Sequence, residues 1–285
     1  MVVLVSLLTA VIYGAGDFCG GLAAKRCRVV EVVAISHVFG LAGATAVSLG
    51  IGAPVTGTDL LLGGLGGVLG GIGVALLYRR LAVGPMQVVA PLTAVTSAAV
   101  PAIWAVATGE RPGPVVVAGL LLALVSIGLV SRSGDDDGDA PITPAVIAES
   151  LLAGAGFGGF FILLDMTDPA SAPWPVVGAR LFTAIGLGAV VLVGWRRNGA
   201  GPLRAPDRRS LWPLLAATGL LDTAANAGFL YATISGSLAV AAVLTSLYPV
   251  STAVLAWVAL GERMNRFQYG GFVGALVASG LIAAG

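Results

Sequence analysis

The sequence predicts an all-α polytopic membrane protein with about ten transmembrane helices, arranged as two inverted five-helix repeats. Three observations support this prediction. Hydrophobic residues make up 57% of the 285 positions and charged residues only 10%, which is too little charge to cover the surface of a soluble chain. Turn and charge signals divide the chain into segments long enough to cross a bilayer. The two halves also carry matching motifs in the same order.

About 20 apolar residues cross the hydrocarbon core, so each segment of that length is a predicted helix. The first segment lacks a positively charged start and is interpreted as a retained helix rather than a cleaved signal peptide. Basic residues or Gly and Pro separate the first five helices, expected near 2–24, 30–52, 59–78, 84–107 and 112–131. The second five are expected near 143–165, 173–195, 210–232, 236–259 and 266–284.

An acidic stretch with Gly and Pro at 132–142 is the expected linker between a first repeat at 1–131 and a second repeat at 143–285. Four motif pairs link the two repeats in order: Gly14–Gly16 with Gly154–Gly156, Ser36–Phe39 with Ala179–Phe182, Leu77–Tyr78 with Leu230–Tyr231, and Gly109–Arg111 with Gly261–Arg263. Five helices per repeat is an odd number, so the second repeat enters the membrane from the opposite side. Inverted repeats are typical of secondary transporters, whose substrate site lies near the midplane between the repeats.

Several segments are similar to the EamA-type transporters of the drug/metabolite transporter superfamily: Tyr13–Lys25, Ala75–Tyr78, and Leu247–Val250 continuing through Leu260–Arg263. The resemblance covers nearly the whole chain and implies two five-helix repeats that export, or sometimes take up, small metabolites, amino acids, sugars or drugs. One departure is that Pro249 in the second repeat has Ser97 as its counterpart in the first. A kink in the fourth helix therefore need not mirror the one in the ninth.

Acidic residues inside the predicted spans are the first candidates for substrate binding or coupling, because charge at membrane depth is costly. Asp17 lies well inside the first helix, where its carboxylate would bind a cationic group, take up a coupling proton, or only hydrogen-bond a neighbouring helix. Asp222 and Asn226 lie one turn apart in the eighth helix and share a face beside Thr223. They are expected to line an aqueous cavity or to make a polar contact between helices.

His37 and Arg180 occupy corresponding positions in the two repeats. Arg180 stays charged, so it would either attract a carboxylate-bearing substrate or neutralise one of the two buried aspartates. A cavity lined by these aspartates and Arg180 would suit a zwitterion. His37 would relay protons or serve as a satisfied core histidine. Tyr248, beside a proline, is the strongest aromatic candidate for the cavity wall.

Two glutamates, Glu110 and Glu262, lie near helix ends beside arginines and are expected to form structural ion pairs. No metal site or cofactor is expected. The stretch Gly154–Gly159 satisfies the dinucleotide-binding pattern, but it lies inside a predicted membrane helix with no preceding strand.

The orientation depends on which observation is followed. Loops after odd-numbered helices hold thirteen Lys and Arg residues, and loops after even-numbered helices hold only Arg111. By the positive-inside rule, which we favour, both termini lie outside the cell. The family resemblance implies that both termini are cytoplasmic.

The leading hypothesis is a secondary transporter in the cell membrane that exports a small metabolite by alternating access. Its expected partners are the small-molecule substrate, the lipid bilayer and protons as a candidate coupling ion, with the chain as a monomer or homodimer. The net charge of +1 gives no reason to expect nucleic acid. An uncoupled channel or lipid scramblase is the alternative, followed by an integral-membrane enzyme acting on lipid, which one His and scattered acids support poorly.

Overall fold

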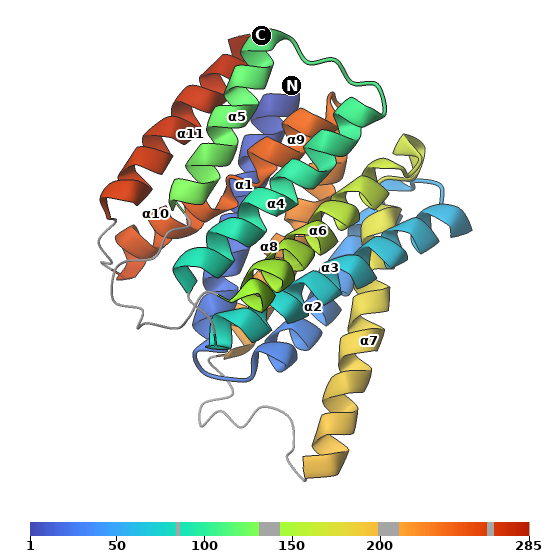
Figure 1. Cartoon of the computed structure of the whole chain (residues 1–285). Coiled ribbons are helices and arrows are strands. Elements are labelled where there is room, and N and C mark those ends of the chain that lie inside the picture. The colour runs from blue at the N-terminus through green and yellow to red at the C-terminus, as the bar shows by residue number, and fades with distance from the viewer. Residues whose placement is uncertain (84–85, 131–142, 199–210, 261–264, 285) are drawn as a thin grey trace.

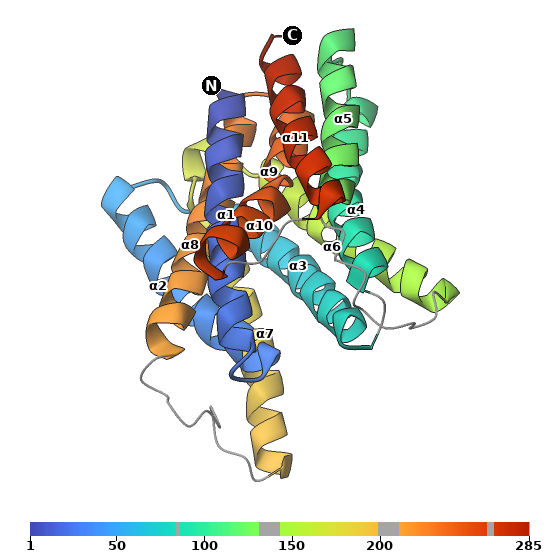
Figure 2. The same ribbon diagram turned by 90° about the vertical axis from the view of Figure 1, so that its left-hand side faces the viewer.

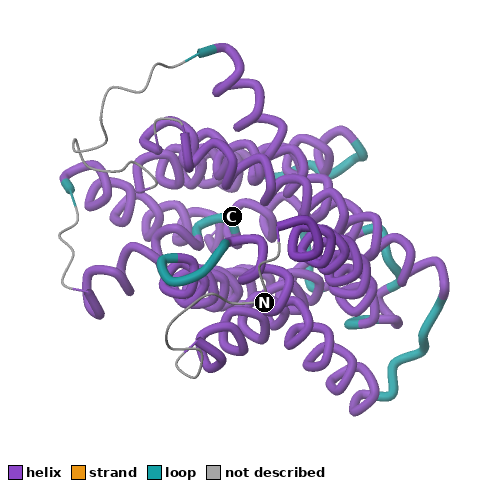
Figure 3. Tube along the Cα trace, turned by 90° about the horizontal axis from the view of Figure 1, so that it is seen from below, coloured by secondary structure: helices purple, strands orange, loops and turns teal. Residues whose placement is uncertain are grey.

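The structure, a computed structural model, describes residues 1–83, 86–130, 143–198, 211–260 and 265–284, and within them it is helical with no strands. Figure 3 shows that short loops join the helices in this part of the chain. The expected acidic linker at 132–142 lies outside the described residues, as does Glu262. The helices of the first half are α1 (Val2–Ala24), α2 (Val29–Ile51), α3 (Gly57–Val83), α4 (Met86–Ala107) and α5 (Pro114–Val130). Those of the second half are α6 (Pro144–Asp165), a 3-10 turn (Pro169–Ser171), α7 (Trp174–Asn198), α8 (Leu211–Ile234), α9 (Leu238–Thr245), α10 (Tyr248–Leu260) and α11 (Arg266–Ala284).

The predicted polytopic all-α fold is confirmed. Seven segments of the described chain are long and apolar enough to cross a membrane, and one of them combines α9 and α10. The helices α4 and α5 contribute shorter apolar stretches, and α8 is 24 residues long but more polar. Together they account for the ten expected spans in this part of the chain.

Three predicted helix bounds are wrong. The ninth helix, expected as one segment at 236–259, is broken into α9 and α10 around Leu247. The third and seventh helices, expected to end at 78 and 195, continue to Val83 and Asn198. Both helices run on through arginines, because arginine is a good helix former and ends a span without ending the helix.

Contacts between the halves correspond in pairs. The helix α1 packs against α8, and its counterpart α6 packs against α3; α2 packs against α7, and α5 against α11. Figures 1 and 2 show that α1 runs away from the end of the bundle that holds both termini, whereas α6 runs toward it. In Figure 1, α2 and α7 are likewise opposed. These are the directions expected of inverted repeats.

Glycine makes the closest of these contacts possible. A Cβ at Gly219 of α8 would lie 1.8 Å from the Ser36 carbonyl oxygen of α2, and one at Gly63 of α3 would lie 1.9 Å from that of Pro175 in α7. No other residue allows backbones to approach this closely, which is why membrane helices place small residues at their interfaces.

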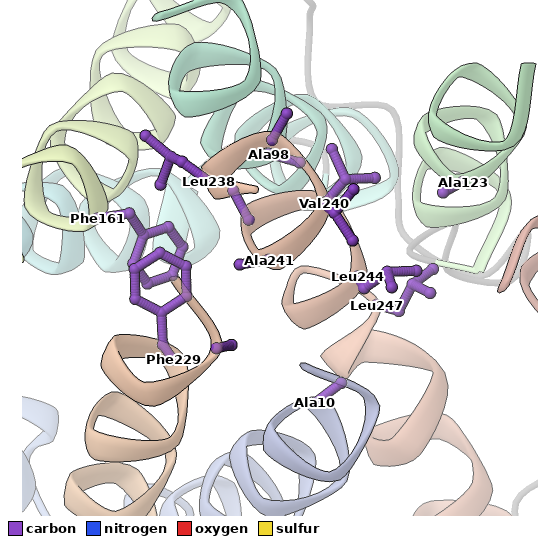
Figure 4. Close-up of a cluster of buried hydrophobic side chains, with 14 of the residues drawn as sticks. Ala10, Ala98, Ala123, Phe161, Phe229, Leu238, Val240, Ala241, Leu244 and Leu247 are labelled. Carbon is purple, nitrogen blue, oxygen red and sulfur yellow. The ribbon is translucent and has the colours of Figure 1, made fainter. Parts of the chain in front are cut away.

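The main buried core surrounds α9, as Figure 4 shows. Every residue from Leu238 to Thr245 is buried. The rings of Phe161 and Phe229, from α6 and α8, stack beside it with their centroids 4.2 Å apart. Ala10 of α1 closes another side of the cluster. The bundle is therefore densely packed around α9, toward the N-terminus of α1.

Candidate functional site

The structure brings three of the predicted residues into direct contact where α2, α7 and α8 meet. Arg180 Nη2 lies 2.6 Å from Asp222 Oδ2 in an ion pair, and Arg180 Nη1 lies 3.4 Å from His37 Nε2. Arg180 Nε also donates a 2.8 Å hydrogen bond to Thr223 Oγ1. Of the two roles considered for Arg180, the structure gives it the ion pair with Asp222. Each polar edge of the guanidinium therefore has a partner.

The contacts of His37 fit a neutral ring. The Thr183 hydroxyl donates to the Ala179 carbonyl over 2.8 Å, so its oxygen accepts the 2.7 Å bond from His37 Nδ1. The other ring nitrogen, Nε2, faces an arginine that can only donate, and it therefore presents a lone pair. The distance from Nε2 to Asp222 Oδ2 is 3.8 Å, longer than a hydrogen bond. His37 thus supports the arginine without adding a charge.

A second polar chain joins the first at α8. The Tyr13 hydroxyl of α1 donates a 2.6 Å hydrogen bond to Asn226 Oδ1, and Asn226 Nδ2 donates a 2.7 Å bond to the Asp222 carbonyl oxygen. Asp222 and Asn226 therefore share a face, as their spacing indicated. The ring of Tyr248, the first residue of α10, lies 6.1 Å from that of Tyr13. Tyr13 was not singled out in the sequence, although its place one turn before Asp17 was a usable signal.

Asp17 belongs to the same region but not to the hydrogen-bonded network. It is exposed and lies within electrostatic range of Asp222. Among the described residues no ion pair or hydrogen bond joins its carboxylate to a partner. The predicted residues therefore form one cluster with two kinds of member: a paired set on α2, α7 and α8, and an unpaired carboxylate on α1.

The break between α9 and α10 lies next to this cluster. Gly14 of α1 allows close contact with the start of α10: a Cβ there would lie 2.8 Å from the Tyr248 carbonyl oxygen and 2.5 Å from Ser251 Cβ. The Thr252 hydroxyl donates a 3.3 Å bond to the Gly14 carbonyl. Discontinuous helices at the midplane are a recurrent feature of transporter sites, because their free backbone groups face the substrate.

Glu110 has a role that the sequence did not predict. Its carboxylate accepts a 2.7 Å hydrogen bond from the Leu238 backbone N–H and a short one from the Ser237 hydroxyl, at the start of α9. An acid at this position complements the positive end of the helix dipole. The expected ion pair with Arg111 is replaced by this cap between the α4–α5 turn and α9.

A separate apolar groove of about 500 Å³ lies between α4, α5 and α9. Its lining includes Ile103, Leu121 and Val243, with almost no polar surface. It shares no residue with the polar cluster, and nothing in it could orient a polar solute, so the cluster is the better candidate site. Within the described residues no group of three His, Cys, Asp or Glu side chains could hold a metal ion.

Comparison with known proteins adds to this geometry. The model of the EamA-like transporter family matches residues 145–284. A solved crystal structure, described only as that of a protein, has a TM-score of 0.78 and 16% sequence identity, and the likeness covers 99% of this chain and 98% of the other. At that identity the likeness shows the fold alone. No curated protein matches the chain significantly.

Proposed function

Because the chain belongs to the EamA-like transporter family, it is a multi-pass membrane transporter of the drug/metabolite transporter superfamily, and we propose that it exports a small organic metabolite by alternating access. An amino acid, a related metabolite or a drug is the class of solute in view. Residues 1–131 and 143–285 are the two repeats that would move against each other.

The polar cluster at the contact between the two halves carries this proposal. His37 of the first half contacts Arg180 of the second, and Tyr13 of the first contacts Asn226 of the second. Burying charged and polar groups inside a membrane bundle is costly, and such groups mark substrate or ion pathways by default. Contacts that span both halves are also the ones that a rocking motion would remake.

The proposed cycle uses the asymmetry of the bundle. The end around α9 is closed by apolar packing, whereas Asp17, further along α1, is exposed. A solute would enter from the Asp17 side and reach the cluster. It would leave on the other side when α9 and the first half of α1 separate. A coupled carrier of this kind saturates with substrate and responds to an ion gradient, whereas a channel or scramblase does neither.

The test compares solutes inside and outside cells that express the protein with those of cells that express an Arg180→Gln, Asp222→Asn double variant. Neutralising both partners avoids leaving one buried charge unpaired, which would itself destabilise the fold. Asp165→Asn is the control, since it removes an acid at the end of α6, outside the cluster.

We expect at least one metabolite to accumulate outside cells with the wild type and the control, and this accumulation to collapse with the double variant or when the proton gradient is dissipated. Efflux that ignores gradients would favour the channel hypothesis. A new compound, rather than a redistributed one, would favour the enzyme. A double variant that folds and still exports normally would place the site elsewhere.

A further inference from the structure

The charge balance of the candidate site is set by very few residues. Apart from Arg266 at the start of α11, Arg180 is the only Lys or Arg in the described spans. Within the described helices, two acids lie at least seven residues from either end, Asp17 and Asp222. His37 adds no charge, because its two ring nitrogens fit the neutral form. With both carboxylates ionised, one positive and two negative groups give the site a net charge of −1.

Arg180 is not available to a substrate. Its side chain is only 5% exposed, and its three nitrogens face Asp222, His37 and Thr223. A substrate carboxylate would have to displace the ion pair with Asp222 and leave that aspartate uncompensated, which is strongly unfavourable in a low-dielectric interior. Among the residues that the structure describes, the site therefore offers no free cation to an anion or to the carboxylate of a zwitterion.

Asp17 is available, and its exposed surface is on the inner side of α1. The most exposed apolar residues of the helix, Leu4, Leu8 and Val11, recur at spacings of four and three and mark the lipid face. Asp17 lies on the opposite face, one turn after Tyr13, which contacts α8 and α10. A charged residue exposed on the lipid face would be costly, whereas on the inner face it can meet a solute.

Two aromatic rings lie near this part of α1: that of Tyr13, one turn before Asp17, and that of Tyr248 at the start of α10. The rings of Tyr13 and Tyr248 lie 6.1 Å apart and are tilted by 54°. Their π faces attract cations, and the attraction grows when the cation is desolvated. An unpaired carboxylate one helical turn from a pair of tyrosines is thus the chemistry that recognises an ammonium group.

We propose that the substrates of this transporter are small organic cations and that Asp17 is the residue that binds their ammonium group. This inference rests on the proposed function and narrows it. The zwitterion suggested by the sequence is disfavoured, since it needed Arg180 to be free.

The test uses three probes that share a phenyl group and differ in charge: phenethylammonium, 3-phenylpropionate and phenylalanine. Equilibrium dialysis of the labelled probes against the purified full chain in lipid nanodiscs measures their binding at pH 7. We expect saturable binding of phenethylammonium, at least about tenfold tighter than that of the other two, as the loss of one charge-assisted interaction implies.

Two variants test the role of Asp17. Asp17→Asn keeps the shape and should weaken phenethylammonium binding roughly tenfold or more, whereas Asp17→Glu keeps the charge and should retain most of it. Asp165→Asn should bind like the wild type. Elution as a single species and an unchanged helical circular dichroism signal would establish that each variant is folded.

The inference is overturned if phenethylammonium shows no saturable binding, if phenylpropionate or phenylalanine binds as tightly, or if Asp17→Asn binds like the wild type. These outcomes leave the proposed function standing when the export experiment still finds a solute that depends on the cluster. If the export experiment fails but phenethylammonium binds tightly, the cation site is supported and the proposed transport cycle is rejected.

Discussion

The two parts of the broken ninth span differ sharply in their surroundings. All eight residues of α9 are buried, and the helix is packed by α1 and α4. None of the α10 residues whose burial is described is buried, and α10 packs mainly on α1. Glu110 holds the start of α9 through the Leu238 backbone, while α10 begins at the tyrosine beside the polar cluster.

This difference indicates how the site is built. A fully packed helix has few alternative positions, because its core neighbours would all have to repack. A partly exposed helix that is held mainly by one partner, through a glycine, has more freedom to shift. We therefore expect α9 to act as the closed barrier of the transporter and α10 to be the part that responds to substrate.

The strongest test of this comparison locks the barrier. The Cβ of Val2 lies 3.0 Å from the place where a Cβ at Gly236, just before α9, would lie. A small shift gives the Cβ separation of about 3.8 Å found in disulfides. With Cys19 and Cys27 replaced by alanine, a Val2→Cys, Gly236→Cys pair should stop transport when oxidised and recover it when reduced.

The matched controls are the two single-cysteine proteins, which should transport equally well with and without oxidant. Alternating access requires the barrier to open, so an oxidised double-cysteine protein with undiminished transport would show that the α1–α9 contact never separates. The disulfide itself is checked by mobility on a gel after proteolysis between the two positions.

A weaker but still large effect is expected at the contact between α1 and α10. Gly14→Ala places a Cβ 2.5 Å from Ser251 Cβ, so the two helices must move apart, at a cost of about 1–3 kcal/mol. We expect a lower melting temperature in detergent and slower transport. Gly21→Ala, on the same helix, is the control, because nothing lies within 4 Å of the place where its Cβ would be. Equal behaviour of the two variants would mean that α10 is not held through Gly14.

The cap on α9 should contribute less. Glu110→Ala removes the acceptor of the Leu238 N–H and the charge at the helix start, which should lower the free energy of unfolding by about 1–2 kcal/mol. Arg111→Ala, at the exposed neighbouring position, should change it little. The measurement is thermal unfolding of each variant. A larger loss for Arg111→Ala would restore the ion pair expected from the sequence.

The spans could be predicted because hydropathy and length are local properties. The bilayer requires about 20 apolar residues per helix, and Gly, Pro and charge mark the interruptions. Pro249 predicted a kink in the ninth helix, but the break at Leu247 was not predicted, because no residue there forbids a helix. Pro249 fits the first turn of α10, where its missing N–H costs nothing. It can be recognised as the start of a helix only after the break before it is known.

The site was partly predictable for a similar reason. Charged residues in apolar spans stand out, so the sequence predicts Asp17, His37, Arg180 and Asp222 as candidates. Which aspartate pairs with the arginine depends on the distance between helices that are far apart in the sequence. That pairing decides whether the site offers a cation or an anion to its substrate. The sequence therefore suggested a zwitterion, whereas the pairing of Arg180 with Asp222 leads us to propose a cation.

The smallest expected effect concerns the hydrogen bond that joins α1 to α8 at the site. Tyr13→Phe removes the 2.6 Å hydrogen bond to Asn226 and keeps the ring beside Tyr248. The loss of about 1 kcal/mol should weaken the apparent affinity for the exported solute roughly fivefold, because α8 is then held less firmly against α1. The control is Tyr231→Phe at an exposed tyrosine of α8, which should leave the affinity unchanged. If Tyr13→Phe also leaves the affinity unchanged, the hydroxyl is structural and the site depends on the ring alone. A complete loss of transport would instead place Tyr13 in direct contact with the substrate. In that case α1, rather than α10, is the element that responds first.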